Sequence, residues 1–291
     1  MAMTTRPPDI EDGQAAPLAA AAAERHGRTL ALLRGALDAG RFHLAFQPVV
    51  HAGDPARVHF HEALFRIRDG SGAEVAARSF MPAAEAEGIG REVDRAALAL
   101  ALRELADVPA LRLSVNLSAR TIGDADWMHL LRREIASRPA LSGRLTVELT
   151  EGSAPALPGL ALEVMDELRS FGVRLALDDF GTGHSSLAHL QDYRFDVLKI
   201  DGRFARGIAA DRDDRALLAS MLGLARHFGM LAVVERVETD AQAAALRAMG
   251  VDGLQGYLFG RPTDRPRWRE GGTPPRSAAS GNAARVASGA G

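Results

Sequence analysis

Residues 144–179 read RLTVELTEGSAPALPGLALEVMDELRSFGVRLALDD. The short apolar runs at 144–149 and 173–178 predict β-strands, and the segment at 160–171 between them carries apolar residues at helical spacing. A strand, a helix and a second strand in this order predict a βαβ unit, in which the two strands run parallel.

The same alternation continues on both sides of this unit. The other segments with strand character are 43–50, 58–65, 111–117, 195–200, 231–235 and 252–255. The other segments with helical periodicity are 92–106, 124–136, 212–228 and 240–248. Thr239 and Gln242 predict a capping box at the start of the last helix. Eight strands with interleaved helices predict an α/β fold, a modified TIM (β/α)8 barrel.

The connection between the first two strands is unlike the others. It is a short stretch that contains Gly53, Asp54 and Pro55, which is too short for a crossover helix. We therefore expect one antiparallel strand near the N-terminus. An open doubly wound sheet is the alternative, but no glycine-rich phosphate-binding loop follows the first strand.

Composition divides the chain into three parts. Residues 1–24 are rich in Ala, Pro and charge without a helical or strand period, which predicts a disordered N-terminal tail. Residues 25–268 form one predicted barrel domain without an interior linker, and this domain begins with a helix at 25–40. Residues 269–291 consist largely of Gly, Ser, Ala, Pro and Arg, which predicts a disordered C-terminal tail.

The whole-chain composition excludes several classes of protein. The 291 residues include no Cys, which excludes disulfides, thiolate zinc sites, iron–sulfur clusters and Cys nucleophiles. A net charge of −2 argues against a polycationic binder of polymeric nucleic acid. No apolar run approaches the roughly 20 residues that span a bilayer, and the Ala-rich stretch 15–23 makes a poor signal peptide. We therefore expect a cytoplasmic protein that binds no membrane.

Two residue types are scarce enough to draw attention to their positions. Lys199 is the only Lys, so the other 34 basic residues are Arg. Asn116 is the only Asn outside the predicted tails. Arg and Lys are not interchangeable where a compact ammonium is needed, so both residues are candidates for a functional site.

Polar residues close most of the predicted strands. They are Asn116, Glu148, Glu151, Asp178, Asp179, Lys199, Glu235 and Gln255, and Glu62 lies inside the second strand. The carboxyl ends of barrel strands meet at one face, where so many carboxylates would repel one another without a cation. Oxygen ligands without Cys suit Mg²⁺ or Mn²⁺, and two such ions can promote phosphoryl displacement. The pattern predicts metal-assisted phosphoester hydrolysis.

The ordered motifs resemble those of the EAL domain family. They are Glu62-Ala63-Leu64 with Arg66, Asn116-Leu117-Ser118, Glu148-Leu149-Thr150-Glu151, Asp178-Asp179-Phe180-Gly181-Thr182-Gly183, Leu198-Lys199-Ile200-Asp201, Val237-Glu238-Thr239 and Gln255-Gly256-Tyr257. The similarity covers residues 43 to 265. It implies a modified TIM barrel and a phosphodiesterase that uses Mg²⁺ or Mn²⁺ to open cyclic di-GMP to linear pGpG.

The resemblance also implies roles for individual residues. The ligands of one metal ion would be Glu62, Asn116, Glu148 and Asp178. The ligands of the second would be Asp178, Asp179 and Glu235. The remaining catalytic roles would fall to Lys199 and Gln255, which would orient water and phosphate, and to Glu151, which would brace the loop after Asp179. The substrate contacts would be Gln47 and Arg66, whose forked donors suit a phosphodiester.

Two positions depart from the family pattern. Arg236 stands where Gly is usual, and we expect an Arg there to exclude a positive φ angle. If Arg236 points into the mouth of the barrel, it could pair with Glu235 and weaken the second metal site, or it could bind phosphate. If it points outward, it has no effect on the site. His184 stands where Tyr is usual.

Three functions therefore remain open: an active phosphodiesterase, a receptor that binds cyclic di-GMP without cutting it, and a protein-interaction module. The complete ligand set favours the first, and Arg236 is the one feature that favours the second. The family resemblance further implies a homodimer formed near residues 184–194, or a regulatory protein partner.

Overall fold

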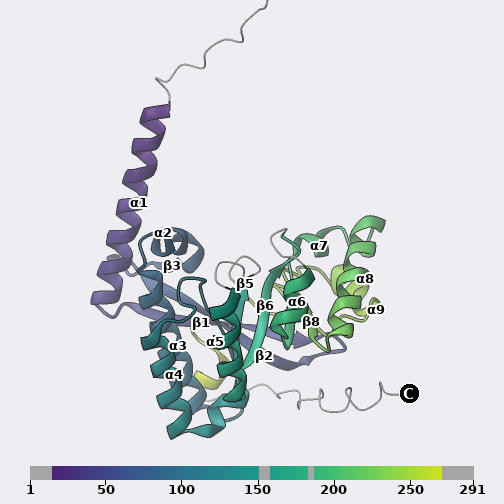
Figure 1. The fold of residues 1–291 in the computed structure, drawn as a ribbon. Helices are drawn as coiled ribbons and strands as arrows, with labels where there is room; N and C mark the ends of the chain where they lie inside the picture. Colours follow the sequence, from purple (N-terminus) through teal and green to yellow (C-terminus); the bar gives the residue numbers. More distant parts are fainter. Residues whose placement is uncertain (1–14, 151–157, 183–186, 271–291) are drawn as a thin grey trace, which may run out of the picture.

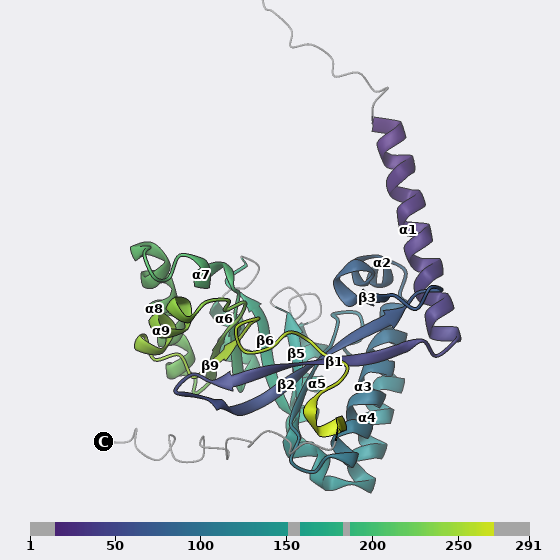
Figure 2. The ribbon, with the colours of Figure 1, turned by 180° about the vertical axis from the view of Figure 1, so that it is seen from behind.

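The computed structural model describes residues 15–150, 158–182 and 187–270, and within them nine strands form one sheet. The strands are β1 (Phe42–His51), β2 (Asp54–Arg68), β3 (Glu74–Ala76), β4 (Leu113–Asn116), β5 (Leu145–Thr150), β6 (Arg174–Phe180), β7 (Val197–Ile200), β8 (Leu231–Val234) and β9 (Gly253–Gln255). Their order is β1-β9-β8-β7-β6-β5-β4-β2-β3, and an additional pairing of β1 with β2 closes a ring that leaves β3 outside (Figures 1 and 2).

Helices lie outside the ring (Figures 1 and 2). The α-helices are α1 (Ala15–Asp38), α2 (Met81–Ala86), α3 (Gly90–Asp107), α4 (Ala125–Ser137), α5 (Pro158–Ser170), α6 (Leu187–Tyr193), α7 (Arg203–Arg206), α8 (Arg212–His227) and α9 (Asp240–Ala248). Short 3₁₀ helices are η1 (Ala77–Ser79), η2 (Pro139–Arg144) and η4 (Arg267–Glu270). Among the described residues, none of the helices has the length and apolar character needed to cross a membrane.

The predicted barrel with one antiparallel strand is confirmed. β1 runs antiparallel to both of its neighbours, β2 and β9, whereas the pairings from β2 and β4 round to β8 and β9 are parallel. The tight connection between β1 and β2 leaves no room for a crossover helix, so the chain turns back directly. The register places Gln47 opposite Glu62, which brings a predicted substrate residue beside a predicted metal ligand.

The structure differs from the sequence-based expectation at several short elements. α1 begins at Ala15 rather than at residue 25, because the Ala-rich run has the highest helix propensity and continues the helix. Residues 269 and 270 belong to η4, and the rest of the two predicted tails lies outside the described residues, apart from the start of α1. The strand β3 and the helices α2, α6 and α7 are too short to show a clear period in the sequence. The capping box of Thr239 and Gln242 is confirmed.

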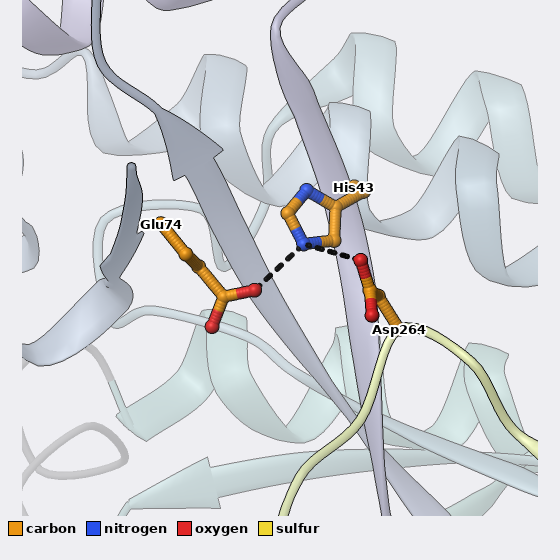
Figure 3. Close-up of side chains that lie close together, drawn as sticks. All are labelled: His43, Glu74 and Asp264. Atoms are coloured by element: carbon orange, nitrogen blue, oxygen red, sulfur yellow. Dashed lines mark hydrogen bonds and ion pairs between the residues drawn. The ribbon is translucent and has the colours of Figure 1, made fainter. Parts of the chain in front are cut away.

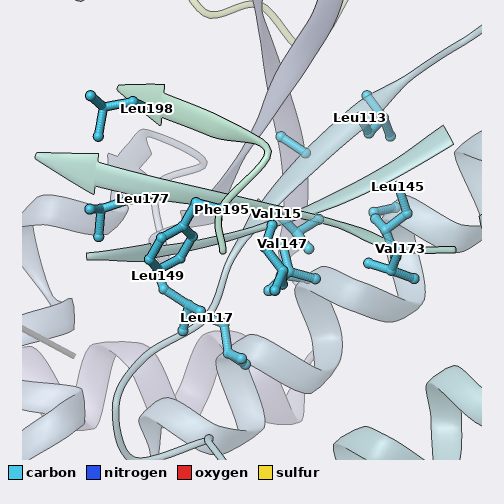
Figure 4. Close-up of a cluster of buried hydrophobic side chains, with 14 of the residues drawn as sticks. Leu113, Val115, Leu117, Leu145, Val147, Leu149, Val173, Leu177, Phe195 and Leu198 are labelled. Carbon is cyan, nitrogen blue, oxygen red and sulfur yellow. The ribbon is translucent and has the colours of Figure 1, made fainter. Parts of the chain in front are cut away.

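Apolar side chains form two layers on the two sides of the ring. The large outer cluster packs the strands against the helices and includes Leu113, Val115, Val147, Leu177 and Leu198 (Figure 4). The small inner cluster consists of Val49, Phe60, Ala176, Val197 and Val233, which come from five strands. Alternate residues of a strand face the same side, so the next inward positions lie directly above this inner cluster.

Candidate active site

Five of the polar residues of the site lie next to the inner apolar cluster. Each lies two residues from a member of that cluster on the same strand or its extension: Gln47 and Val49, Glu62 and Phe60, Asp178 and Ala176, Lys199 and Val197, and Glu235 and Val233. The two-residue period of a strand therefore points these side chains into the mouth of the barrel. Thus the strand ends meet as the sequence predicts.

Lys199 lies at the centre of this group, and its side chain is 1% exposed. Its Nζ is 2.6 Å from Glu148 Oε2, 2.8 Å from Glu235 Oε1, 3.0 Å from Asp178 Oδ1 and 3.3 Å from Glu62 Oε2. One compact ammonium reaches four carboxylates from four strands or their ends, which a planar guanidinium does not do. This arrangement explains why a chain with 34 Arg keeps a Lys at this position.

The pKa values follow from burial and from the excess of negative charge. Burial alone would lower the pKa of Lys199, but the four carboxylates outweigh it and hold that pKa well above its usual range. Burial raises the pKa of Glu148 to about 8 and raises the pKa of Glu235 well above its usual range. The site therefore stays short of positive charge even with Lys199 protonated.

A second set of contacts organises Glu62. Asn116 Nδ2 donates to Glu62 Oε1 at 3.1 Å, and Gln255 Nε2 donates to Glu62 Oε2 at 2.7 Å. Gln255 Nε2 also lies 3.2 Å from Gln47 Oε1. Burial by itself would raise the pKa of Glu62, but the charge of Lys199 and these amide donors outweigh it and lower that pKa below its usual value.

The donor set suits a hard cation. Oxygens of Asp178, Asp179 and Glu235 lie within 4.8 Å of one another. Two buried oxygens, Glu148 Oε1 and Gln255 Oε1, accept no hydrogen bond within the described part of the chain. Carboxylate and amide oxygens that lack a partner are the ligands that Mg²⁺ and Mn²⁺ prefer.

Asp179 has an unusual backbone. Its φ angle is 56°, in the left-handed region that non-glycine residues rarely adopt. The β6–β7 pairing shifts register between Leu177 and Phe180, and this irregularity turns Asp179 away from the regular strand. Burial, together with Asp178 and Asp201, raises the pKa of Asp179.

An open cavity of about 370 Å³ lies over these carboxylates. Its lining includes the predicted substrate residues Gln47 and Arg66, together with Glu62, Asp178, Asp179, Glu235 and Gln255. Arg66 is buried; its Nε lies 3.5 Å from Glu74 Oε1, and its Nη1 donates to Phe65 O at 3.0 Å. Gln47 Nε2 donates to Gly260 O at 3.1 Å. The hydrogen-bond donors predicted to contact the substrate and the carboxylates predicted to bind metal thus line the same cavity.

The expectation that Arg236 excludes a positive φ angle is wrong, because its φ angle is 53°. The suggested pairing with Glu235 is not the contact that the structure shows. Arg236 Nη2 lies 3.2 Å from Asp201 Oδ2 and 4.0 Å from Asp179 Oδ1, and Arg236 lines the cavity. The backbone is held in the left-handed region because the amides on either side are bound to neighbouring strands: Glu235 N to Ile200 O at 3.1 Å and Val237 N to Gln255 O at 2.9 Å.

Some residues were left out of the predicted site or lie beyond the described residues. Glu151 and His184 lie outside the described residues, so their predicted roles stay untested. Asp201 is buried, binds Arg236 and accepts a hydrogen bond from Arg203 N at 2.9 Å. The cavity lining also includes Arg78 and Tyr257. Tyr257 follows the Gln-Gly motif, whereas nothing in the sequence points to Arg78.

A separate group of side chains gathers His43, Glu74 and Asp264 (Figure 3). His43 Nε2 lies 2.9 Å from Glu74 Oε2 and 3.9 Å from Asp264 Oδ2. The two carboxylates already have guanidinium partners, since Arg66 contacts Glu74 and Arg68 Nη2 lies 2.8 Å from Asp264 Oδ2. Their charge is balanced, in contrast to that of the group around Lys199.

Comparisons with known proteins identify the family of this chain. A family model described as EAL domain matches residues 31–262. The cyclic di-GMP phosphodiesterase PdeF of Escherichia coli is 33% identical over 235 residues, which are 79% of this chain and 31% of PdeF. The cyclic di-GMP phosphodiesterase NbdA of Pseudomonas aeruginosa is 33% identical over 79% of this chain and 30% of its own length. The chain thus spans about a third of the length of these curated relatives.

Solved structures share the fold. The PaMucR phosphodiesterase in complex with cyclic di-GMP is 31% identical, has a TM-score of 0.74, and is matched over 81% of this chain and 97% of that chain. The FimX EAL domain of Pseudomonas aeruginosa bound to cyclic di-GMP has a TM-score of 0.75 at 24% identity over the same shares, which supports the fold.

Proposed function

The chain belongs to the EAL domain family, and we propose that it is a metal-dependent phosphodiesterase that hydrolyses cyclic di-GMP to linear pGpG. The observation that carries this proposal is the buried ammonium of Lys199 among four carboxylates beneath an open cavity. The names of PdeF, NbdA and the PaMucR complex, all of which specify cyclic di-GMP, support the choice of substrate.

We propose that Mg²⁺ or Mn²⁺ binds in two positions. Glu62, Asn116, Glu148 and Asp178 would hold one ion, and Asp178, Asp179 and Glu235 would hold the other. The unpartnered Glu148 Oε1 and the excess of carboxylates support this assignment. When bound, such ions lower the pKa of a water ligand and neutralise charge on a phosphate.

The protein's own residues would then position the reacting groups. Lys199, held in its charged form by its neighbours, would keep the carboxylates together and orient the attacking water. Gln255 donates to Glu62 and would fix that ligand and the water beside it. We assign Glu151 a bracing role after Asp179 from the family resemblance.

The substrate would lie in the cavity with its second phosphate near Arg66. Arg66 presents forked donors that suit a phosphodiester oxygen, and its backing by Glu74 keeps the guanidinium in place. Gln47 adds an amide to the lining of the same cavity. A cytoplasmic location, and a homodimer or a regulatory protein partner, remain predictions from the sequence.

A receptor that binds cyclic di-GMP with weak or no turnover is the second candidate. It is favoured by Arg236, which brings a guanidinium 4.0 Å from Asp179. A protein-interaction module would require the site to have lost nucleotide binding altogether, and no described feature favours it over the other two.

Hydrolysis by the purified full chain tests the proposal. We expect Mg²⁺ or Mn²⁺ to support formation of linear pGpG, and Glu62→Gln to lower turnover by about a hundredfold or more, because it removes a ligand charge at nearly constant shape. Glu163→Gln, an exposed change on α5, is the matched control and should retain wild-type turnover. Metal-dependent binding of cyclic di-GMP without cleavage would replace the enzyme by the receptor. Absence of both would leave the interaction module.

A further inference from the structure

Arg236 occupies a position that both neighbouring strands hold in place. The amides of Glu235 and Val237 are hydrogen-bonded to Ile200 O and Gln255 O. The backbone of Arg236 between them takes a φ angle of 53°, which a side chain other than glycine rarely adopts. The side chain therefore leaves the chain in a set direction at the edge of the cavity, directly after the proposed ligand Glu235.

Gly202 provides the space for this side chain. A Cβ atom at Gly202 would lie 2.4 Å from Arg236 Cβ and 2.7 Å from Arg236 Cγ, so a larger residue at 202 would displace the stem. These two contacts involve the root of the Arg side chain rather than its mobile end. The placement of Arg236 is thus supported both by its own backbone and by a glycine on the neighbouring segment after β7.

The guanidinium lies between two acidic groups of different kinds. Nη2 is 3.2 Å from Asp201 Oδ2, and Asp201 also accepts from Arg203 N at 2.9 Å and Arg203 Nε at 3.2 Å. Asp201 is therefore a buried structural anchor that does not line the cavity. Nη2 is also 4.0 Å from Asp179 Oδ1, and Asp179 belongs to the group with Asp178 and Glu235.

We infer that Arg236 weakens the binding of a divalent cation at Asp178, Asp179 and Glu235, so that this chain binds one cation tightly and a second one much less tightly. The inference rests on the proposed function, which supplies the two cation positions. A fixed unit charge within a few ångström repels a divalent ion and competes with it for Asp179. In a water-facing site, this repulsion corresponds to about a tenfold or greater loss of affinity.

The first ion position is protected from this effect. Glu62 and Glu148 contact Lys199, and Asn116 contacts Glu62. Within the part of the chain that the structure describes, Arg236 pairs with Asp179 and Asp201 and with none of these three. The wild-type protein should therefore bind the first cation much more tightly than the second. When the guanidinium is removed, the affinity of the second site should rise toward that of the first.

Binding of Mn²⁺ to the full chain, measured by calorimetry and by electron paramagnetic resonance of free Mn²⁺, tests the inference. We compare wild type with Arg236→Met, Arg236→Gly and Arg236→Lys. Met removes the charge and keeps most of the stem, Gly removes the charge and suits the positive φ angle, and Lys keeps the charge. Met and Gly should each tighten the weaker site about tenfold or more, whereas Lys should stay near wild type.

Arg203→Met is the matched control, because Arg203 also binds Asp201 but does not line the cavity. It should leave both Mn²⁺ affinities within about twofold of wild type, which is well below the expected effect. Equal tight binding of two ions to wild type, or unchanged affinities in both Arg236→Met and Arg236→Gly, would overturn the inference. Folding of Arg236→Gly is not at issue, since glycine accepts this backbone conformation.

Turnover of cyclic di-GMP measured on the same samples separates the two proposals. If the protein hydrolyses cyclic di-GMP but Arg236→Met and Arg236→Gly bind Mn²⁺ as wild type does, the inference about Arg236 is wrong and the proposed phosphodiesterase activity is supported. If these variants bind the second Mn²⁺ more tightly but no sample hydrolyses cyclic di-GMP, the inference about Arg236 is supported and the proposed phosphodiesterase activity is wrong.

Discussion

Lys199→Met removes the one ammonium from the mouth of the barrel while keeping a side chain of similar length. The four carboxylates that Lys199 contacts at 2.6 to 3.3 Å would then face one another without their shared cation. Because Lys199 and Glu148 are almost completely buried, water does not replace the lost charge. We expect Lys199→Met, in the absence of bound metal ions, to have a much lower free energy of unfolding than the wild-type protein.

The size of the effect follows from this burial. Removing one partner of a buried ion pair costs about 3–5 kcal/mol, whereas an exposed pair costs about 0–1 kcal/mol. For a domain of this size, 1 kcal/mol corresponds to about 2–4 °C in Tm, so the Tm of Lys199→Met should fall by about 6–20 °C. The upper part of this range is reached only if the carboxylates stay ionised.

Thermal unfolding followed by circular dichroism, in chelator at neutral pH, measures this fall. Arg203→Met is the control; it removes a half-exposed cation from Asp201 and should lower Tm by no more than about 4 °C. Addition of Mn²⁺ should raise the Tm of Lys199→Met, since a cation that binds only the folded protein stabilises it. A variant that melts within about 2 °C of wild type in chelator would refute the reasoning, because it would show that Lys199 does not neutralise these carboxylates.

Two further predictions concern the residues that support the site. Gly256→Ala should lower both Tm and turnover, because a Cβ there would lie 2.0 Å from Val237 O; overpacking of this kind costs about 1–3 kcal/mol or more. Gly223→Ala, which meets nothing within 4 Å, is its control, and equal Tm values for the two variants would contradict the expectation. Burial raises the pKa of Asp94, so the folded state binds this proton more tightly than the unfolded state, and stability is lost as pH rises above 3.8 through the raised pKa. Asp94→Asn should therefore gain Tm relative to wild type as pH rises from about 3 to about 8, and a constant difference across that whole range would exclude the linkage.

The periodicity of the chain determined most of the fold. The structure of long amphipathic helices and apolar strands, such as those in 144–179, can be predicted from the local sequence. One face of each such element must be buried along its whole length, and this requirement leaves a periodic pattern of apolar residues. The short elements β3, α2, α6 and α7 carry no such period, and their formation depends on the elements that they pack against. The start of α1 was misplaced because a run of Ala has high helix propensity but no apolar face.

The positions of the site residues were likewise set by sequence, since polar residues after buried strands must meet at one face of a parallel barrel. Only the tertiary structure decided their partners. Lys199 binds four carboxylates that are distant in sequence, and Arg236 turns to Asp201 rather than to the adjacent Glu235. A sequence states which side of a strand a residue faces, because that follows from local geometry. Which of several nearby carboxylates a basic side chain contacts depends on the distances between strands. For Arg236 it also depends on a left-handed backbone conformation that the neighbouring strands impose. Both are set only when the barrel closes.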